Sequence, residues 1–234
     1  MVNLWDLLLW VVFPYVSIAV FVVAHLYRYA TNPYGWTSRS SEFLEKGWLR
    51  WGSLLFHWGV IFALLGHVGG LGVPMSWVEA LGVSPELYHL LAIVIGGTAG
   101  VAAVAGLVIL LLRRTLTERL RLTSTRMDFL ALALLLVVVG LGIGNTLGYN
   151  LLYGSYEYRV TMGPWLRGLL TLRPDASLMV DVPITFQLHA LAAFGLAGVW
   201  PFTRLVHVWS VPLTYVGRTP ILVRAYAQKT AGGR

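Results

Sequence analysis

Four of the six histidines in this chain lie in two apolar stretches, where a titratable side chain is costly to bury. His57 and His67 are ten residues apart in one stretch, and His189 and His207 are eighteen apart in the other. On a helix, ten residues turn a side chain about 80° and rise about 15 Å, whereas eighteen make five full turns and rise about 27 Å. Each pair can therefore be presented to a neighbouring helix.

Antiparallel packing of the two stretches would set His57 opposite His207 at one membrane face, and His67 opposite His189 at the other. Two imidazoles on opposite sides of a porphyrin are a common axial ligand set for haem iron. Four packing histidines, or a proton path through a transporter, remain open at this point. The two axial rises differ by about 12 Å, which haem tilt, helix crossing or a kink at Pro201 could absorb.

The composition indicates a membrane protein. The chain has 234 residues, of which 57% are hydrophobic and 12% charged, and it contains no cysteine. Disulfides, thiolate-held iron-sulfur clusters and covalent c-type haem attachment are therefore excluded within this chain. Any metal or haem must be held by other residues.

Five windows without charged residues predict the elements that position the histidines. Each window is long enough for a helix to cross a hydrocarbon core of about 30 Å, and a chain in lipid must satisfy its own backbone hydrogen bonds. The N-terminal run lacks a basic segment, so we expect it to be retained as the first span. We predict an all-α membrane protein with two haems stacked inside the bundle. The windows are residues 7–27, 51–78, 87–112, 129–156 and 182–203.

The basic residues predict the orientation of the spans. Most of the Lys and Arg residues lie in the first and third connections and in the C-terminal tail. The positive-inside rule then places the N-terminus outside and the C-terminus in the cytoplasm, so the net charge of +7 needs no nucleic-acid partner. The long fourth connection, residues 154–181, carries aromatic residues such as Tyr156 and Trp165, and we expect it to lie along the outer membrane interface.

Several motifs give the chain a resemblance to a known family. It resembles the gamma subunit of membrane-bound respiratory nitrate reductase, a five-helix dihaem cytochrome b, over nearly its whole length. The motifs are "NPYGWTSRSSEFLEKG" at 32–47, "LFHWGVIFALLGHVGG" at 55–70, "FQLHALAAF" at 186–194, "PFTRLVHVWSVP" at 201–212 and "LVRA" at 222–225.

The resemblance implies ligands, cofactors and partners. His57 and His207 would hold the inner of two b-type haems, and His67 and His189 the outer one. In the family, quinol is oxidised beside the outer haem and electrons pass to the inner haem. They continue to the iron-sulfur clusters of a cytoplasmic beta subunit and then to a molybdenum alpha subunit that reduces nitrate. The expected location is the cytoplasmic membrane of a prokaryote.

The chain departs from better-known members of the family at the quinol site. Those members carry a lysine at the outer start of the third helix, where this chain reads "SPELYHLL". Tyr88 and His89 lie near that place, and His89 could act as hydrogen-bond partner or proton acceptor of the quinol hydroxyl, because imidazole titrates near neutral pH. Glu86 is a less favoured candidate, and the alternative is an interfacial histidine with no role.

Other polar residues receive expectations of their own. Arg204 and Arg113 could pair with haem propionates, although the positive-inside rule also accounts for both. His25 matches no family ligand and is expected at the interface, in reach of water or headgroups. We assign residues 1–212 to the membrane domain and 213–234 to a cytoplasmic tail that docks on the iron-sulfur subunit.

Two further classes of protein compete with this interpretation. The chain could be the cytochrome b anchor of another molybdenum or sulfur-metabolising respiratory complex. It could also be a transporter or structural anchor without haem.

Overall fold

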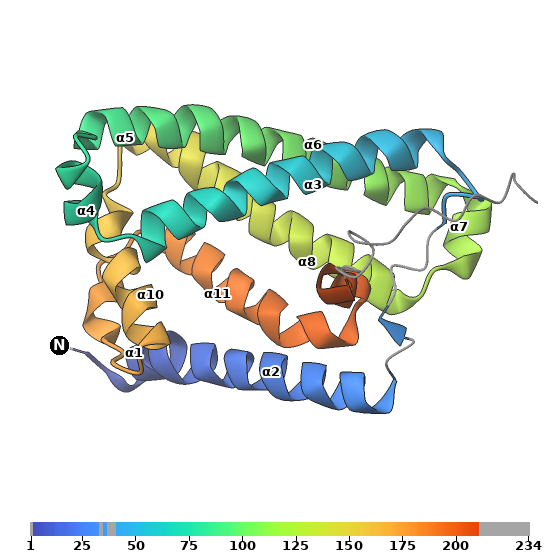
Figure 1. Cartoon of the computed structure of the whole chain (residues 1–234), viewed down its shortest axis with the longest axis horizontal. Coiled ribbons are helices and arrows are strands. Elements are labelled where there is room, and N and C mark those ends of the chain that lie inside the picture. Colours follow the sequence, from blue (N-terminus) through green and yellow to red (C-terminus); the bar gives the residue numbers. More distant parts are fainter. Residues whose placement is uncertain (1, 33–34, 37–40, 211–234) are drawn as a thin grey trace, which may run out of the picture.

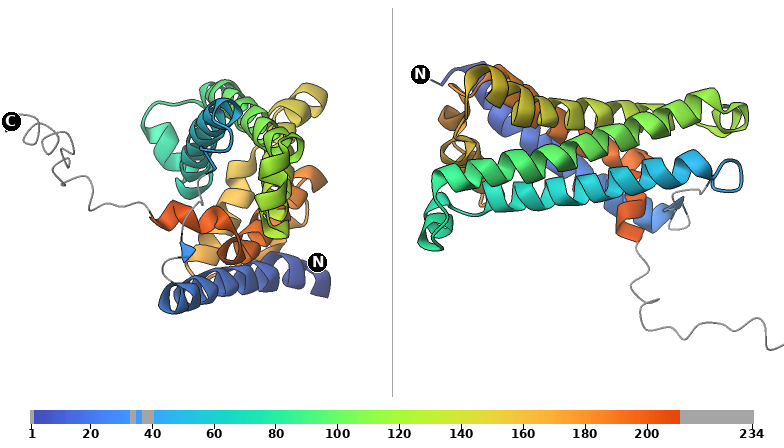
Figure 2. Two further views of the ribbon diagram at one scale, coloured as in Figure 1. Left: turned by 90° about the vertical axis from the view of Figure 1, so that its right-hand side faces the viewer. Right: turned by 90° about the horizontal axis from the view of Figure 1, so that it is seen from above.

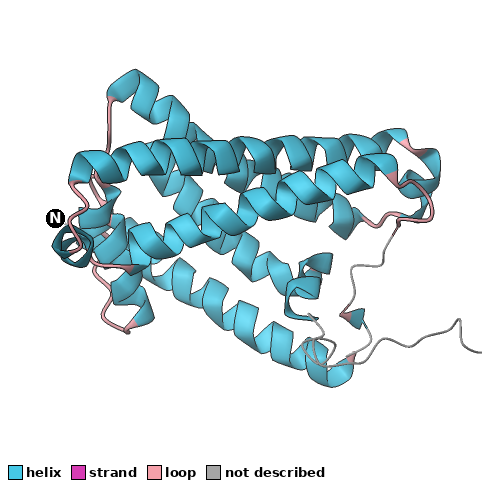
Figure 3. Cartoon of the chain, turned by 45° about the horizontal axis from the view of Figure 1, so that its top comes forward, coloured by secondary structure: helices cyan, strands magenta, loops and turns pink. Residues whose placement is uncertain are grey.

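The computed structural model describes residues 2–32, 35–36 and 41–210, and every regular element within these ranges is helical (Figure 3). Five helices in this part of the chain are long and apolar enough to cross a membrane (Figure 1). The five-span prediction is therefore confirmed. The spans are Leu4–Thr31, Gly47–Gly72, Pro85–Leu116, Arg126–Tyr153 and Ile184–Phe202.

The spans are built from consecutive helical stretches, and the first four each contain a π-helical turn. In chain order the elements are α1 (Leu4–Leu7), η1 (Leu8–Val12), α2 (Phe13–Thr31), α3 (Gly47–His67), η3 (Val68–Gly72), α4 (Met75–Ala80), α5 (Pro85–Leu91), η4 (Ala92–Gly96), α6 (Gly97–Leu116), α7 (Glu118–Thr123), α8 (Arg126–Ile143), η5 (Gly144–Tyr149), α9 (Asn150–Tyr153), η6 (Tyr158–Val160), α10 (Met162–Leu170), η7 (Ala176–Met179), α11 (Ile184–Val199), η8 (Trp200–Phe202) and η9 (Arg204–Ser210).

Side-chain caps fix where several helices begin. Thr125 and Asp128 form a capping box at the start of α8, and the Asp128 carboxylate accepts the Thr125 backbone N–H at 2.8 Å. Ser84 caps α5 by accepting the Leu87 N–H. Glu45 accepts the first free N–H groups of α3, including that of Trp48 at 2.9 Å. Because lipid cannot satisfy exposed N–H groups, these caps set the ends of the spans.

Glycine lets two spans approach closely. The main packing pairs are α3 with α6, α6 with α8, α8 with α11 and α11 with α2 (Figure 1). A Cβ on Gly59 of α3 would lie 2.6 Å from both the Ala103 nitrogen and the Ala99 oxygen of α6. Helix packing in membranes depends on such small residues, because burial of apolar surface provides no driving force there.

The fourth connection packs onto the bundle, so its key aromatic side chain is buried. The Trp165 side chain of α10 is 3% exposed, and its Nε1 donates to the Trp10 backbone oxygen at 2.9 Å. Trp165 thus anchors α10 on the bundle, and the position of this connection along the outer interface stays a prediction. The Trp10 and Phe194 rings are both packed edge to face with the Trp165 ring, with centroids 6.0 and 5.8 Å from its centroid. An indole whose N–H has a hydrogen-bond partner is stable in such a core.

The fifth span breaks before the last histidine. The α-helix ends at Val199, and Pro201, which lacks a backbone N–H, follows in a short 3-10 turn. Thr203 then closes the turn, because its hydroxyl donates to the Trp200 oxygen at 2.8 Å and accepts the Leu205 N–H at 3.1 Å. The next element, η9, runs across the bundle rather than along it (Figure 2).

This break corrects the expected relation between His189 and His207. The two residues do not lie on one continuous helix, because His189 belongs to α11 and His207 to η9. The difference of about 12 Å between the two axial rises assumed one helix from His189 to His207. Because the helix breaks between them, this difference no longer argues against the pairing. The sequence suggested a kink at Pro201. In the structure the helix ends before Pro201 and the chain changes direction there.

Candidate metal-ligand pairs and an adjoining polar cluster

His67 of α3 and His189 of α11 face each other. Their ring centroids are 5.8 Å apart and the ring planes meet at 33°. The Nδ1 atom of His67 lies 2.7 Å from the Ala63 oxygen, and that of His189 lies 3.0 Å from the Val138 oxygen on α8. Both rings are thus oriented by backbone carbonyls, one from the same helix and one from a neighbour.

His57 and His207 form a second pair ten residues earlier along α3. Their ring centroids are 6.3 Å apart, with the planes at 69°. The Nδ1 atom of His57 lies 2.7 Å from the Ser53 oxygen, and that of His207 lies 2.6 Å from the Arg204 oxygen. The structure therefore brings the four histidines together in the two combinations expected from the sequence.

The hydrogen bonds assign the proton on each ring. A carbonyl oxygen can only accept, so each Nδ1 donates and the ring's lone pair lies on Nε2, the atom that would bind a metal. Two metal–nitrogen bonds of about 2 Å, with about 1 Å from each nitrogen to its ring centre, place ring centres about 6 Å apart. The measured separations of 5.8 and 6.3 Å agree with this value.

The donor set favours a metal that brings other ligands with it. Within the described ranges, no group of three or more His, Asp or Glu residues lies together. A bare zinc ion takes three or four protein ligands, whereas iron in a porphyrin already has four equatorial nitrogens and needs only two axial donors. The two histidine pairs fit the second kind of centre.

A basic cavity of about 680 Å³ lies beside His57. Lys46, Arg50 and Ser53 line it together with His57, and so does Glu42, which forms an ion pair with Lys46. The sequence reasoning did not connect Lys46 and Arg50 with His57. The steps from Lys46 to Arg50, Ser53 and His57 are four, three and four residues, which puts these positions on one face of a helix. Anionic groups of a ligand bound at His57 would find their countercharges here.

The two arginines proposed from the sequence have protein partners. Arg113 is 3% exposed; it donates from Nε to Glu45 at 2.6 Å and from Nη1 to the Ser41 hydroxyl at 3.0 Å. Arg204 forms an ion pair with Asp128, whose side chain is 2% exposed. Both arginines lie at the same end of the bundle as His57 and His207, and their pairing with propionates stays a prediction.

A third arginine fixes the turn that precedes η9. Arg28, at the end of α2, donates to the Pro201 oxygen at 2.5 Å and to the Thr203 oxygen at 2.9 Å. The carbonyl oxygens at this break have lost their helical partners, so a cationic donor satisfies them. Arg28 and Asp128 therefore hold the segment before His207 from two different spans.

His25 is buried among aromatic rings, so the prediction that its side chain reaches water or headgroups is wrong. Its side chain is 8% exposed and its Nδ1 lies 2.6 Å from the Phe21 oxygen. The rings of Phe21, Trp36 and Trp209 lie 4.3, 5.6 and 6.4 Å from the His25 ring. Two of these rings come from segments distant in sequence, which a reading of the first span alone could not include.

The Tyr88 hydroxyl lies beside Gly70, three residues after His67 in the same span, and His89 follows Tyr88 in α5. The Tyr88 hydroxyl bonds to the Tyr158 hydroxyl at 2.9 Å. Both hydroxyls press against Gly70 of η3, where a Cβ would lie 2.5 Å from the Tyr88 oxygen and 2.9 Å from that of Tyr158. Glycine is thus required at position 70 for this approach, which connects Tyr88 to the helix that carries His67.

Glu157 and Arg159 complete a polar cluster around His89 that the sequence reasoning missed. The Nε2 atom of His89 lies 3.2 Å from a Glu157 carboxylate oxygen. Arg159, whose side chain is 1% exposed, donates to both oxygens of that carboxylate, at 2.7 and 2.6 Å. Burial raises the pKa of Glu157, but the hydrogen bonds and charge of Arg159 outweigh it and hold this pKa below its ordinary value.

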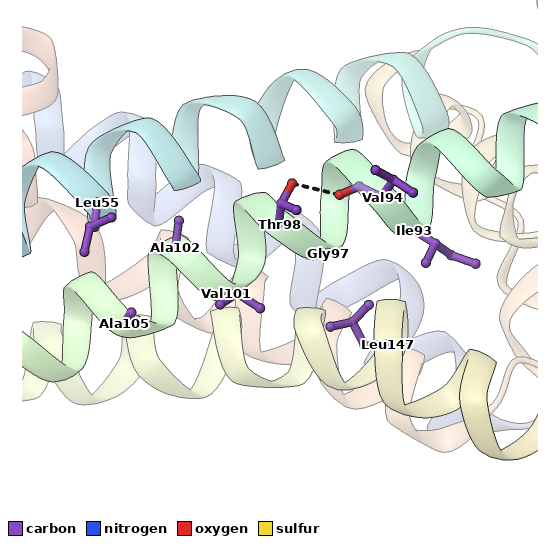
Figure 4. A pocket seen from close by; sticks show the side chains of 9 residues that line it. All are labelled: Leu55, Ile93, Val94, Gly97, Thr98, Val101, Ala102, Ala105 and Leu147. Carbon is purple, nitrogen blue, oxygen red and sulfur yellow. Dashed lines mark hydrogen bonds between the residues drawn. The ribbon is translucent and has the colours of Figure 1, made fainter.

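A separate apolar cavity of about 600 Å³ opens along α6, where residues of α3 and η5 complete its walls (Figure 4). Its lining residues include Ile93, Val101 and Leu147, and none of them is titratable. The one hydrogen bond drawn there joins the Thr98 hydroxyl to the Val94 oxygen within the same helix (Figure 4). This cavity therefore offers no side chain for acid–base or metal-ligand chemistry.

Comparison with known proteins identifies the family. Residues 6–226 match the family described as nitrate reductase gamma subunit. The chain is similar to the nitrate reductase gamma chain of Bacillus subtilis, with 44% identity over 93% of this chain and 97% of that protein. It is also similar to the respiratory nitrate reductase 1 gamma chain of Escherichia coli, with 33% identity over 92% of this chain and 95% of that protein.

Proposed function

The chain belongs to the nitrate reductase gamma subunit family, and we propose that it serves as the quinol-oxidising, dihaem cytochrome b subunit of such an enzyme. As a family member with five apolar spans, it is a multi-pass membrane subunit of an oxidoreductase complex and associates with other nitrate reductase subunits. The observation that carries the proposal is the pair of facing histidine couples, with ring centroids 5.8 and 6.3 Å apart.

Two b-type haems would be held by these couples. His57 and His207 would ligate the inner haem, and His67 and His189 the outer one. A bound haem supplies an iron that accepts and gives up one electron at a time. The chain's own contribution is to fix the imidazoles. Each Nδ1–H donates to a backbone carbonyl, so each ring is held in the tautomer whose Nε2 lone pair is available to a metal.

The propionates of the inner haem would find basic partners at the arginine-rich end of the bundle. Arg50, in the cavity beside His57, is the partner that the geometry favours, while Lys46 in the same cavity pairs with Glu42 at 3.6 Å. Arg204 and Arg113 stay candidates, each with its present carboxylate as competitor. An anionic propionate gains most from a planar guanidinium, which can bind both of its oxygens at once.

The quinol would bind at Tyr88 and His89. Both residues lie beside the end of α3 that carries His67, since the Tyr88 hydroxyl contacts Gly70. A quinol hydroxyl would donate its hydrogen bond to the His89 imidazole, which can take the proton. Proton release at this end would accompany electron movement toward the other.

Orientation and partners follow from the charge distribution and the family. The N-terminus would lie outside and the C-terminus in the cytoplasm of a prokaryote. Electrons would pass to an iron-sulfur beta subunit and on to a molybdenum alpha subunit. The proposed docking tail, residues 213–234, lies outside the described residues.

A pyridine haemochrome measurement on the purified chain tests the central claim. Two b haems per chain are expected. A chain without haem would refute the proposal and favour a transporter or a structural anchor. Two haems in a complex that lacks nitrate reductase activity would instead favour the cytochrome b anchor of another molybdenum or sulfur-metabolising complex.

A further inference from the structure

The polar cluster at the end of α5 contains more acid–base groups than quinol binding requires. His89 faces Glu157 through Nε2, and only one imidazole nitrogen can take this contact. The other ring nitrogen, Nδ1, is the one that a quinol hydroxyl could approach. A proton taken up on one nitrogen of a ring therefore has an acceptor at the other.

We propose that Glu157 is the proton acceptor behind His89, and that the pair conducts protons from the quinol site to the aqueous face. This inference rests on the proposed quinol oxidation. In each transfer, a quinol O–H bond breaks and an N–H bond forms at Nδ1 of His89, while the Nε2–H bond breaks and an O–H bond forms on Glu157. Before the next transfer, the imidazole returns to the Nε2–H tautomer by proton exchange with water. The oxidant would be the haem that His67 and His189 would hold, which would take the two electrons of the quinol, and Glu157 gives its proton to water.

The exposure of the two side chains supports the direction of this path. The His89 side chain is 19% exposed and that of Glu157 is 28% exposed, so the carboxylate is the more accessible group. Glu157 also lies in the connection between spans rather than within one. A proton that reaches Glu157 is therefore at the edge of the bundle.

Arg159 gives the carboxylate the properties that a relay needs. Its guanidinium binds both carboxylate oxygens and lies over the Tyr88 ring, with 3.8 Å from Cζ to the ring centroid. Neither group can then turn away from His89 without breaking a buried ion pair. The positive charge also lowers the pKa of Glu157, so that a proton taken from His89 is held weakly and passes on to water.

The titratable and charged groups around the relay come from three elements. His89, Tyr88 and Glu86 belong to α5, while Tyr158 and Arg159 belong to η6. Arg167 of α10 is turned to the Leu71 backbone oxygen, which it binds at 2.7 Å. The carboxylate that contacts His89 is that of Glu157, the residue directly before η6.

The test uses the complex purified from membranes through this chain, with a short-chain reduced naphthoquinone as the electron donor. In Glu157→Gln, we expect the maximal rate of haem reduction to fall about 100-fold, with the KM for the quinol changed less than about 2-fold, because Glu157 acts through His89. The rate of the variant should rise with the concentration of imidazole buffer, which replaces the lost acceptor. The wild-type rate should not depend on it.

Two further variants keep the test decisive. Glu157→Gln leaves the buried Arg159 without its carboxylate, so the double variant Glu157→Gln/Arg159→Met removes both charges and should show the same buffer-dependent rate. Glu79→Gln, an exposed acid on α4, is the matched control and should behave as wild type. Haem content reports folding in every case.

The outcomes separate the two proposals. A Glu157→Gln complex with both haems and the wild-type rate overturns the relay, and so does a slow complex that buffer does not rescue. A wild-type complex whose haem is not reduced by the quinol overturns the proposed function itself.

Discussion

Asp128 of α8 forms an ion pair with Arg204 of η9, three residues before His207. The carboxylate is 2% exposed, also lies 3.4 Å from Arg114, and accepts the Thr125 N–H at the start of α8. One side chain thus caps a span and anchors the element that carries a candidate ligand.

Replacement of Asp128 by Asn should destabilise the protein by about 3 kcal/mol, because it leaves two arginines at the bundle end without a counterion. The free energy of unfolding in detergent measures the effect. Glu42→Gln, which removes one partner of an exposed pair with Lys46, should cost less than about 0.5 kcal/mol. Equal effects of the two substitutions would refute the structural role of Asp128.

A methyl group at Gly59 should separate α3 from α6. The added Cβ would lie 2.6 Å from two backbone atoms of α6, and backbone cannot move aside as a flexible side chain does. We expect Gly59→Ala to cost about 1–3 kcal/mol of unfolding free energy. Gly140→Ala, where nothing lies within 4 Å of the new atom, should be neutral or stabilising. A neutral Gly59→Ala would contradict this packing.

Loss of one histidine should remove one haem of two. His67→Ala is expected to lose the outer haem and all quinol oxidation, and His57→Ala the inner haem only. The haem content of each purified variant, with the quinol-dependent rate, checks this. His25→Gln should keep both haems, because His25 packs against aromatic rings and not against another histidine. Full activity in His67→Ala would refute the ligand assignment.

Acid should loosen the start of α3. Burial raises the pKa of Glu45. Backbone hydrogen bonds from Trp48 and Leu49, together with the hydrogen bond and charge of Arg113, lower this pKa by a larger amount, so the net shift is downward. A lowered folded-state pKa contributes stability above the ordinary value of 4.5, and this contribution is lost as the pH falls through the folded-state pKa.

Hydrogen exchange over the first turn of α3 measures this loss. Protection should fall as the pH drops below about 4.5, once the intrinsic pH dependence of exchange is corrected for. In Glu45→Gln the protection should be lower at neutral pH and should no longer change across this range. A variant with the wild-type pH profile would show that another group controls this end.

The spans and the histidine pairing could be predicted from the sequence because both depend on simple periodic quantities. Uncharged windows of membrane length locate helices, and ligands on antiparallel helices pair in reverse order. The course of the chain after Val199 could not be found in this way. Trp200, Leu205 and Val206 continue the apolar run, and the turn at Pro201 is held by bonds that Arg28 donates from another span.

The residues that the sequence did not reveal are those defined by contacts between distant segments. Glu157 meets His89 across 68 residues, and no local spacing indicates that contact. His25 is buried because Trp36 and Trp209 close over it. Lys46 and Arg50 are different, because their helical spacing relative to His57 is visible in the sequence. The cavity that they line is visible only in the structure.

The transverse course of η9 makes the two histidine sites unequal. Both residues of the pair at His67 lie within spans. The pair at His57 needs a residue of η9, which follows a turn that Arg28 of α2 holds at Pro201 and is itself held at Arg204 by Asp128 of α8. The site nearest the proposed exit for electrons is therefore the one that depends on contacts from two further spans.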